Sequence, residues 1–112
     1  MSAARYNLVI DQGSDFAVQF AVAESGTPKD LTGYSARAQL RPSKTSSSLS
    51  ATFTCTIPSP TDGTIYMSMN NSISAGLGAG TYFYDLEIYT TNDLLVTRLL
   101  NGDVSLTQEV TR

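Results

Sequence analysis

The chain has 112 residues, a formal net charge of −3 at neutral pH and a hydrophobic content of 41%. This length fits a single domain, residues 1–112, whose core needs no metal or disulfide to be stable. The acidic balance leaves no basic stripe for a phosphate backbone, so nucleic acid is not an expected partner. No apolar run is long enough to span a bilayer and no signal peptide is evident, so we expect no membrane contact and synthesis in the cytoplasm.

Short runs of alternating hydrophobic and polar residues are separated by turn signals, which predicts an all-β fold. The expected strands cover 6–10, 16–22, 34–40, 51–57, 65–69 and 82–88, and a final hairpin follows them. The segment 70–79 is compatible with a helix, but its glycines limit it to about one turn. We expect an interior formed by Phe16, Phe20, Tyr34, Leu40, Phe53, Ile65, Tyr82, Leu86, Ile88 and Val104.

The strand that begins at Tyr82 follows a glycine-punctuated turn, Leu77–Gly80. A leucine and a glycine just before such a tyrosine resemble the tyrosine corner of β-sandwich domains. The predicted architecture is therefore an immunoglobulin-like antiparallel β-sandwich of about seven or eight strands.

The last hairpin has a register that can be predicted. If Asn92-Asp93 forms a two-residue turn, Glu87 lies opposite Arg98 and the two side chains form an ion pair on the outer face. A shift by one residue would turn Arg98 toward the core, which costs far more than a surface ion pair contributes. This register points Leu95 and Leu99 inward.

Further along the same strand, Val104, Leu106 and Val110 have the opposite parity. A change of parity within one extended run requires an extra residue, and Asn101-Gly102 is the expected position of this β-bulge. The alternative is a tight Asn-Gly hairpin at the same position.

The outer face of this hairpin is predicted to be unusually apolar for a monomer. We expect this face to contact another protein, because burying such side chains favours association. The alternative is that a second sheet of the same domain covers it. The predicted partner-contact residues are Phe83, Tyr89, Leu94, Val96 and Leu100.

No enzymatic site is predicted. The Asp11–Asp15 segment lacks the acidic spacing of a calcium-binding loop, and Asx turns explain it equally well. Asp85 and Glu87 are read as solvated carboxylates of an outer strand face rather than an acid–base pair. Cys55 is interpreted as a buried spectator thiol, since the chain has no histidine to act as its base. We therefore expect no catalytic residues, no metal, no cofactor and no small-molecule substrate.

Several segments together resemble the small immunoglobulin-like β-sandwich proteins in virions of tailed bacteriophages, including phages of aquatic bacteria and cyanobacteria. The segments are Asp11–Phe16, Asp30–Arg41, the Leu77–Glu87 corner, the closing Gly102–Val104 run and the ending 109–112. Related domains occur in baseplates, at tail-fibre attachment points and in the neck.

This resemblance implies a structural or adaptor subunit of the virion that contacts other virion proteins in multiple copies. The chain lacks the long C-terminal extension of receptor-binding arrangements, which favours the adaptor role. The alternatives are a free binding module for carbohydrate or a receptor, using exposed tyrosines and the serine-rich loop, or a capsid decoration protein.

Overall fold

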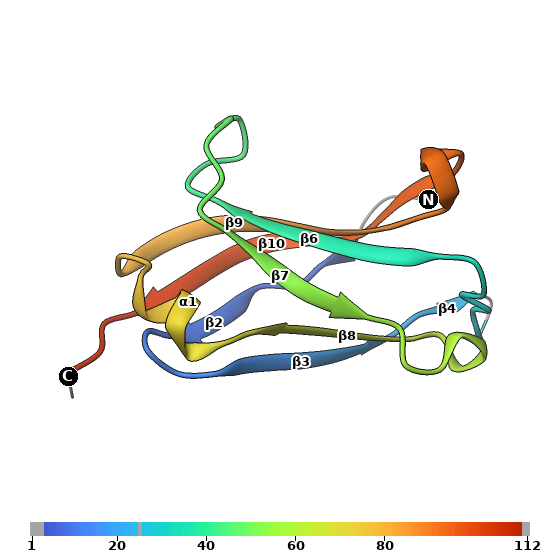
Figure 1. Ribbon diagram of the computed structural model, residues 1–112, viewed down its shortest axis with the longest axis horizontal. Coiled ribbons are helices and arrows are strands. Elements are labelled where there is room, and N and C mark those ends of the chain that lie inside the picture. Colours follow the sequence, from blue (N-terminus) through green and yellow to red (C-terminus); the bar gives the residue numbers. More distant parts are fainter. Residues whose placement is uncertain (1–3, 25, 111–112) are drawn as a thin grey trace.

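A computed structural model describes residues 4–24 and 26–110 of the chain. It is an all-β structure, as predicted, with one short α-helix in the described part (Figure 1). The strands are β1 (Ala4–Arg5), β2 (Leu8–Asp11), β3 (Phe16–Ala21), β4 (Ala23–Glu24), β5 (Thr27–Pro28), β6 (Ser35–Arg41), β7 (Ala51–Thr56), β8 (Thr64–Met69), β9 (Gly80–Tyr89) and β10 (Val96–Thr107). The helix is α1 (Asn71–Ala75), and two 3₁₀ turns are η1 (Pro60–Asp62) and η2 (Thr91–Asp93). None of these helical segments is long or apolar enough to cross a bilayer.

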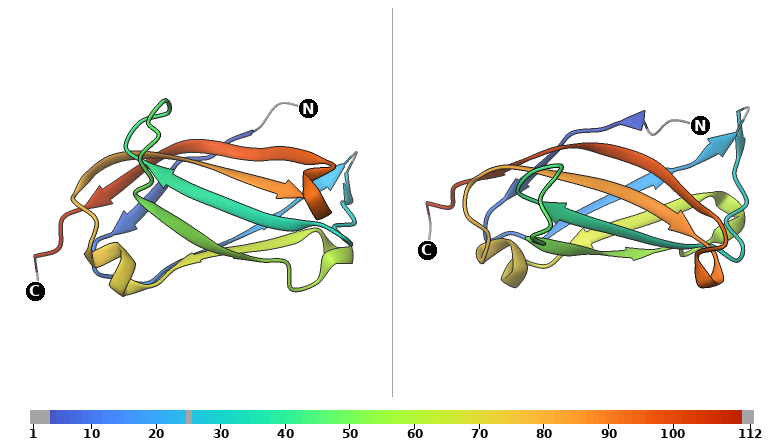
Figure 2. Two further views of the ribbon diagram at one scale, coloured as in Figure 1. Left: turned by 45° about the horizontal axis from the view of Figure 1, so that its top comes forward. Right: turned by 90° about the horizontal axis from the view of Figure 1, so that it is seen from above.

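Eight of the described strands form one curled sheet in the order β1-β10-β9-β6-β7-β8-β3, with β2 also paired to β10. The expectation of a purely antiparallel arrangement is wrong in one respect. β1 and β2 run parallel to β10, so the sheet is mixed. The sheet curls into a half-barrel, which places β3 and β8 across from β9 and β10 (Figures 1 and 2). β4 and β5 form a separate two-stranded hairpin where only a turn was expected.

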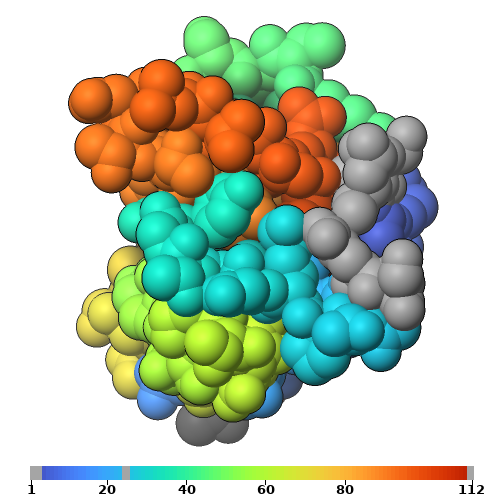
Figure 3. Space-filling model, turned by 90° about the vertical axis from the view of Figure 1, so that its right-hand side faces the viewer, coloured from blue at the N-terminus to red at the C-terminus, as the bar shows by residue number. Residues whose placement is uncertain are grey.

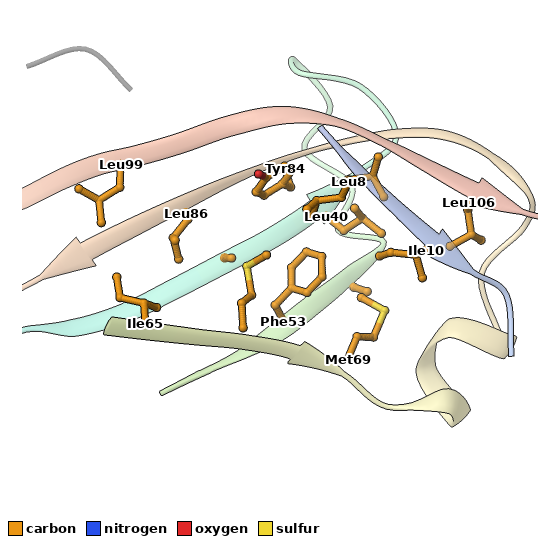
Figure 4. Close-up of a cluster of buried hydrophobic side chains, with 14 of the residues drawn as sticks. Leu8, Ile10, Leu40, Phe53, Ile65, Met69, Tyr84, Leu86, Leu99 and Leu106 are labelled. Atoms are coloured by element: carbon orange, nitrogen blue, oxygen red, sulfur yellow. The ribbon is translucent and has the colours of Figure 1, made fainter. Parts of the chain in front are cut away.

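The hydrophobic core fills the inside of this curl (Figure 4). Leu40, Ile65, Leu86, Ile88 and Val104 are fully buried. All ten residues expected in the interior are either buried or packed against the core. The prediction that Val110 continues the pattern of Val104 and Leu106 is wrong, because β10 ends at Thr107 and the Val110 side chain is exposed. The period-two pattern therefore predicted the expected interior residues correctly, and it fails where β10 ends.

The tyrosine corner is present. The Tyr82 hydroxyl donates a hydrogen bond of 2.7 Å to the carbonyl of Gly78, four residues upstream. The bond ties the turn that leaves α1 to the beginning of β9. The predicted helical turn is also confirmed, and the Asn70 side chain caps it by accepting a hydrogen bond from the Ile73 amide.

The N-terminal segment runs alongside β10 and approaches it very closely at Gly102, which has no side chain. Between β1 and β2, the Tyr6 amide donates to the Asn101 carbonyl at 2.8 Å, and the Tyr6 carbonyl accepts from the buried Tyr84 hydroxyl at 2.6 Å. A Cβ added to Gly102 would lie 2.8 Å from the Tyr6 carbonyl carbon, closer than real Cβ contacts come. This close approach of the Tyr6 backbone therefore requires glycine at position 102.

We predict that Gly102→Ala lowers the free energy of unfolding by about 2 kcal/mol, the usual cost of forcing a methyl group into a packed site. Urea denaturation measures the change. Gly76→Ala is the matched control, because the nearest atom to its added Cβ would lie at an ordinary 3.6 Å. Equal stability of the two variants would contradict the steric role of Gly102.

Candidate functional site

The outer face of β6, β9 and β10 carries most of the charged side chains singled out from the sequence. Asp85 and Glu87 both lie on this face, as predicted, while Tyr84, Leu86 and Ile88 point into the core. Glu87 is paired in register with Arg98, which confirms the predicted alignment of the hairpin.

The β-bulge in β10 exists, but its predicted position is wrong. Arg98 pairs with Glu87 and Leu100 pairs with Leu86, so Leu99 is the extra residue and Asn101-Gly102 continues the ladder. The alternative Asn-Gly hairpin is likewise absent, because β10 runs without interruption from Val96 to Thr107. The bulge allows Leu99 and Leu100 to turn to the same side. Leu99 is buried and Leu100 packs against the core.

The bulge also changes the predicted ion pair. Arg98 contacts Asp85, at 3.2 Å between Nε and Oδ2, instead of Glu87. Glu87 accepts from Arg37 Nε at 2.9 Å. Arg37 further contacts the Asp93 carboxylate at 3.5 Å and lies 4.3 Å from the centre of the Tyr89 ring. The two carboxylates of β9 therefore have different arginine partners, one on each neighbouring strand.

Burial raises the pKa of the Asp85 carboxyl above its usual value, and the nearby Glu87 charge raises it further. The positive charge of Arg98 lowers the Asp85 pKa, and the charges of Arg41 and Arg37 lower it by smaller amounts. Asp85 is thus a carboxylate held in a partly desolvated position by surrounding guanidinium groups. The hydrogen bond to Glu87 raises the pKa of Arg37, so this arginine stays charged.

This face contains a groove with a volume of about 560 Å³. Residues of β6, β9 and β10 line it, together with Ser43 and Lys44 from the loop 42–50, which projects from the sheet (Figure 2). Five of the seven basic residues of the chain line the groove, against two of the ten acidic residues. The basic residues are Arg5, Arg37, Arg41, Lys44 and Arg98. An acidic protein therefore gathers most of its positive charge on one surface.

Sequence reasoning missed this basic groove. A signal was present, since Arg37, Gln39 and Arg41 alternate with the buried Ala38 and Leu40 and must share the outer face of β6. Arg98 on β10 and Lys44 on the loop come to the same place only through the fold. Net charge alone gave no indication of this clustering.

Beside the groove, the β9–β10 hairpin ends in a loop that is longer than predicted. Asn92 and Asp93 have positive φ values of 59° and 54°, as a tight turn at this position requires, but the loop spans all residues between Tyr89 and Val96. Thr90 holds it closed, because its amide donates to the Leu95 carbonyl and its hydroxyl accepts from the Leu95 amide.

Three consecutive aliphatic side chains are exposed at this hairpin tip: Leu94 by 80%, Leu95 by 58% and Val96 by 44%. The prediction that Leu95 points inward is therefore wrong, because it lies in the loop and not in the strand. The tip stands at a margin of the molecule, where its orange atoms project beyond the neighbouring loops (Figure 3).

The predicted partner-contact residues are thus divided between two environments. Leu94 and Val96 are exposed at the tip. Phe83 and Tyr89 are half-buried on the outer face, under Lys44 and Arg37 respectively. Leu100 does not belong to that face, because the bulge turns it toward the core.

The Asp11–Asp15 segment has a structural role, because its side chains form hydrogen bonds to distant parts of the chain. Asp15 accepts hydrogen bonds from the backbone and side chain of Asn71 at the beginning of α1. Gln12 donates to the Leu77 carbonyl and accepts from the Glu109 amide. Within residues 4–24 and 26–110, no three metal-ligating side chains are grouped so that they could hold an ion.

Cys55 is half-buried against the core, and burial raises the pKa of its thiol to about 11. A thiol with this pKa is protonated at neutral pH and is a weak nucleophile.

Neither a protein-family model nor a curated protein sequence matches the chain. Among solved structures, it is similar to the crystal structure of the cysteine protease inhibitor EhICP2 from Entamoeba histolytica. The two are 15% identical, with a TM-score of 0.51 over 93% of this chain and 88% of that one. This likeness concerns the fold alone.

Leu100 and Val96 distinguish the two environments of the hairpin. We predict that Leu100→Asp destabilises the fold by about 2 kcal/mol or more, because it places a carboxylate against the core. Val96→Asp is expected to change stability by less than about 0.5 kcal/mol, since Val96 is exposed. Thermal denaturation followed by circular dichroism compares them. Similar melting temperatures for both variants would show that Leu100 is not part of the core.

We also predict that Asp85 titrates above 3.8 and that Arg98→Gln raises its pKa further, because the guanidinium stabilises the charged carboxylate. Carboxyl-carbon NMR across pH 2–7 measures both values. Asp30 is an internal reference with the opposite sign, because its hydrogen bonds from Thr32 lower its pKa. A lower Asp85 pKa in Arg98→Gln would contradict the assigned ion pair.

Proposed function

We propose that the protein is a structural or adaptor subunit of a tailed-phage virion, in the tail, baseplate, fibre attachment or neck. It acts through contacts with other virion proteins, in multiple copies, and not as an enzyme. We also propose that the curled sheet is a variant of the immunoglobulin-like β-sandwich. Its support is the resemblance of the Asp11–Phe16, Asp30–Arg41 and Leu77–Glu87 segments, together with the tyrosine corner that holds the last of them.

The observation that carries the contact role is the exposed aliphatic tip of the β9–β10 hairpin. Leu94, Leu95 and Val96 present adjacent apolar side chains on a loop that Thr90 holds in place. A rigid apolar projection loses little conformational entropy on binding, and burial of its surface contributes roughly 25 cal/mol per Å² before the cost of association. These are the properties of an anchor for another protein.

The absence of an enzymatic role is supported by the chemistry of the outer face. Asp85 and Glu87 are each engaged by an arginine, and the Cys55 thiol is protonated at neutral pH. The sequence offers no histidine as a general base. A carbohydrate- or receptor-binding module remains the rival function, and a capsid decoration protein a variant of the virion role.

The test uses the phage that encodes the chain. We expect quantitative mass spectrometry of purified particles to find the protein at a fixed copy number. The double variant Leu94→Asp/Val96→Asp should fold with an unchanged melting temperature but be lost from particles, because a charged tip cannot be buried in an apolar contact.

Val9→Asp is the matched control, since Val9 is exposed by 62% on β2, away from the hairpin tip. This variant should remain in the particle. Absence of the wild-type chain from particles would overturn the virion role. Normal incorporation of the folded double variant would overturn the tip as the contact and leave the virion role intact.

A further inference from the structure

Two of the basic residues that line the groove, Arg41 and Lys44, form no ion pair within the described part of the chain. Three of its arginines already hold carboxylates of the chain: Arg5 with Asp103, Arg37 with Glu87 and Asp93, and Arg98 with Asp85. Arg41 and Lys44 have no carboxylate at ion-pair distance among the described residues. The positive charges that lack a carboxylate partner are therefore concentrated at the end of the groove beside the loop 42–50.

Arg41 is held in place for binding. Its two terminal nitrogens donate to the Ser47 carbonyl at 3.0 Å and to Gln39 Oε1 at 2.8 Å. These bonds use only part of its five donors, so the remaining N–H groups can still reach a ligand. A guanidinium that is already oriented loses less entropy when it binds a carboxylate.

Lys44 lies on the other side of the same space. Its ammonium is 5.7 Å from the centre of the half-buried Phe83 ring, and Phe83 is paired in register with Arg41 on the neighbouring strand. A ligand for this place needs an anionic oxygen for Arg41 and Lys44 and a short apolar or aliphatic stem for Phe83. An aspartate or glutamate side chain has both.

From this geometry we propose that the groove binds an extended, acidic peptide segment of a partner protein, with one of its carboxylates between Arg41 and Lys44. The proposal does not depend on the virion role. A groove that is open to solvent along the outer face of the sheet suits a chain lying across the strands better than an enclosed small molecule. Its volume of about 560 Å³ is within the range of pockets that hold ligands of a few residues.

The carboxylates of the same face favour a peptide over a polyanion. Asp85 and Glu87 line the groove, and Asp93 and Asp103 pair with its arginines. A sulfated polysaccharide or a nucleic acid, with closely spaced charges, would bring anionic groups against these four carboxylates. A peptide with separated acidic residues can place its charges at the unpaired cations and neutral residues elsewhere.

The test is an NMR titration of the labelled full chain with a blocked seven-residue peptide that alternates glutamate and serine. We expect amide shifts confined to residues 39–44 and 83–85, and binding that weakens as salt rises. The peptide with glutamine in place of glutamate should cause no such shifts. Shifts of equal size with the neutral peptide would overturn the proposal.

Three single variants each remove one positive charge from a different position. Arg41→Gln and Lys44→Gln should each weaken binding roughly fivefold to tenfold, as expected for a lost charge-assisted contact. Lys29→Gln is the control, because Lys29 lies outside the groove. Lys44→Gln leaves the loop bonds of Arg41 intact, so the test holds even if Arg41→Gln loosens the loop. Equal losses in all three variants would show a non-specific charge effect and overturn the site.

A heparin-derived tetrasaccharide provides the remaining comparison. The proposal requires that it bind the groove more weakly than the acidic peptide at equal salt. Tighter binding of the tetrasaccharide at residues 39–44 would assign the groove to an anionic carbohydrate and overturn the peptide proposal.

Discussion

The extra residue at Leu99 is the constraint on which the rest of the hairpin depends. β10 must bury Leu99 near its beginning and Val104 and Leu106 further along, although these side chains have opposite parity. A regular strand would leave one set in water. The bulge resolves the conflict by opposing Leu99 and Leu100 to the single residue Leu86, so both leucines turn to the core.

The ion pairs of the outer face lie next to that bulge. Beyond it, Asn101 stands opposite Asp85, and Arg98 bends to Asp85 instead of the directly opposed Glu87. Glu87 is then available to Arg37 on β6, the neighbour on its other side. The two carboxylates of β9 are thus paired with arginines of the two neighbouring strands, Arg98 on β10 and Arg37 on β6.

Much of the fold could be predicted from the sequence, because the alternation of Tyr84, Leu86 and Ile88 is a local property of each strand. The alignment of Arg98 with Glu87 was also predictable, since any loop centred on Asn92-Asp93 gives the same register. The position of the bulge was not. Asn101-Gly102 has the composition of a bulge, but Gly102 is needed for the close approach of the Tyr6 backbone to β10.

The candidate site was less predictable because it depends on how separate segments meet. Leu94 and Val96 were identified from the hairpin alone, whereas Leu100 was assigned to the wrong face once the bulge was misplaced. The parallel pairing of β1 and β2 with β10 has no local signal, since no turn joins them. The groove combines Arg5 from β1, Arg41 from β6, Lys44 from a loop and Arg98 from β10. No period in the sequence brings these four together.

Arg37 connects the two surfaces proposed here for binding. It lines the groove and donates a hydrogen bond to Glu87 on β9. It also contacts the hairpin through an ion pair with Asp93 and through the face of the Tyr89 ring. The loop bearing the aliphatic tip is therefore tied to the groove by one side chain and to its own stem by Thr90. Each separate ion pair on an exposed surface contributes little, so Thr90 and Arg37 together, rather than one contact, hold the loop in this arrangement. The exposed aliphatic tip and the basic groove therefore lie next to each other, with Arg37 in contact with both the groove and the hairpin loop.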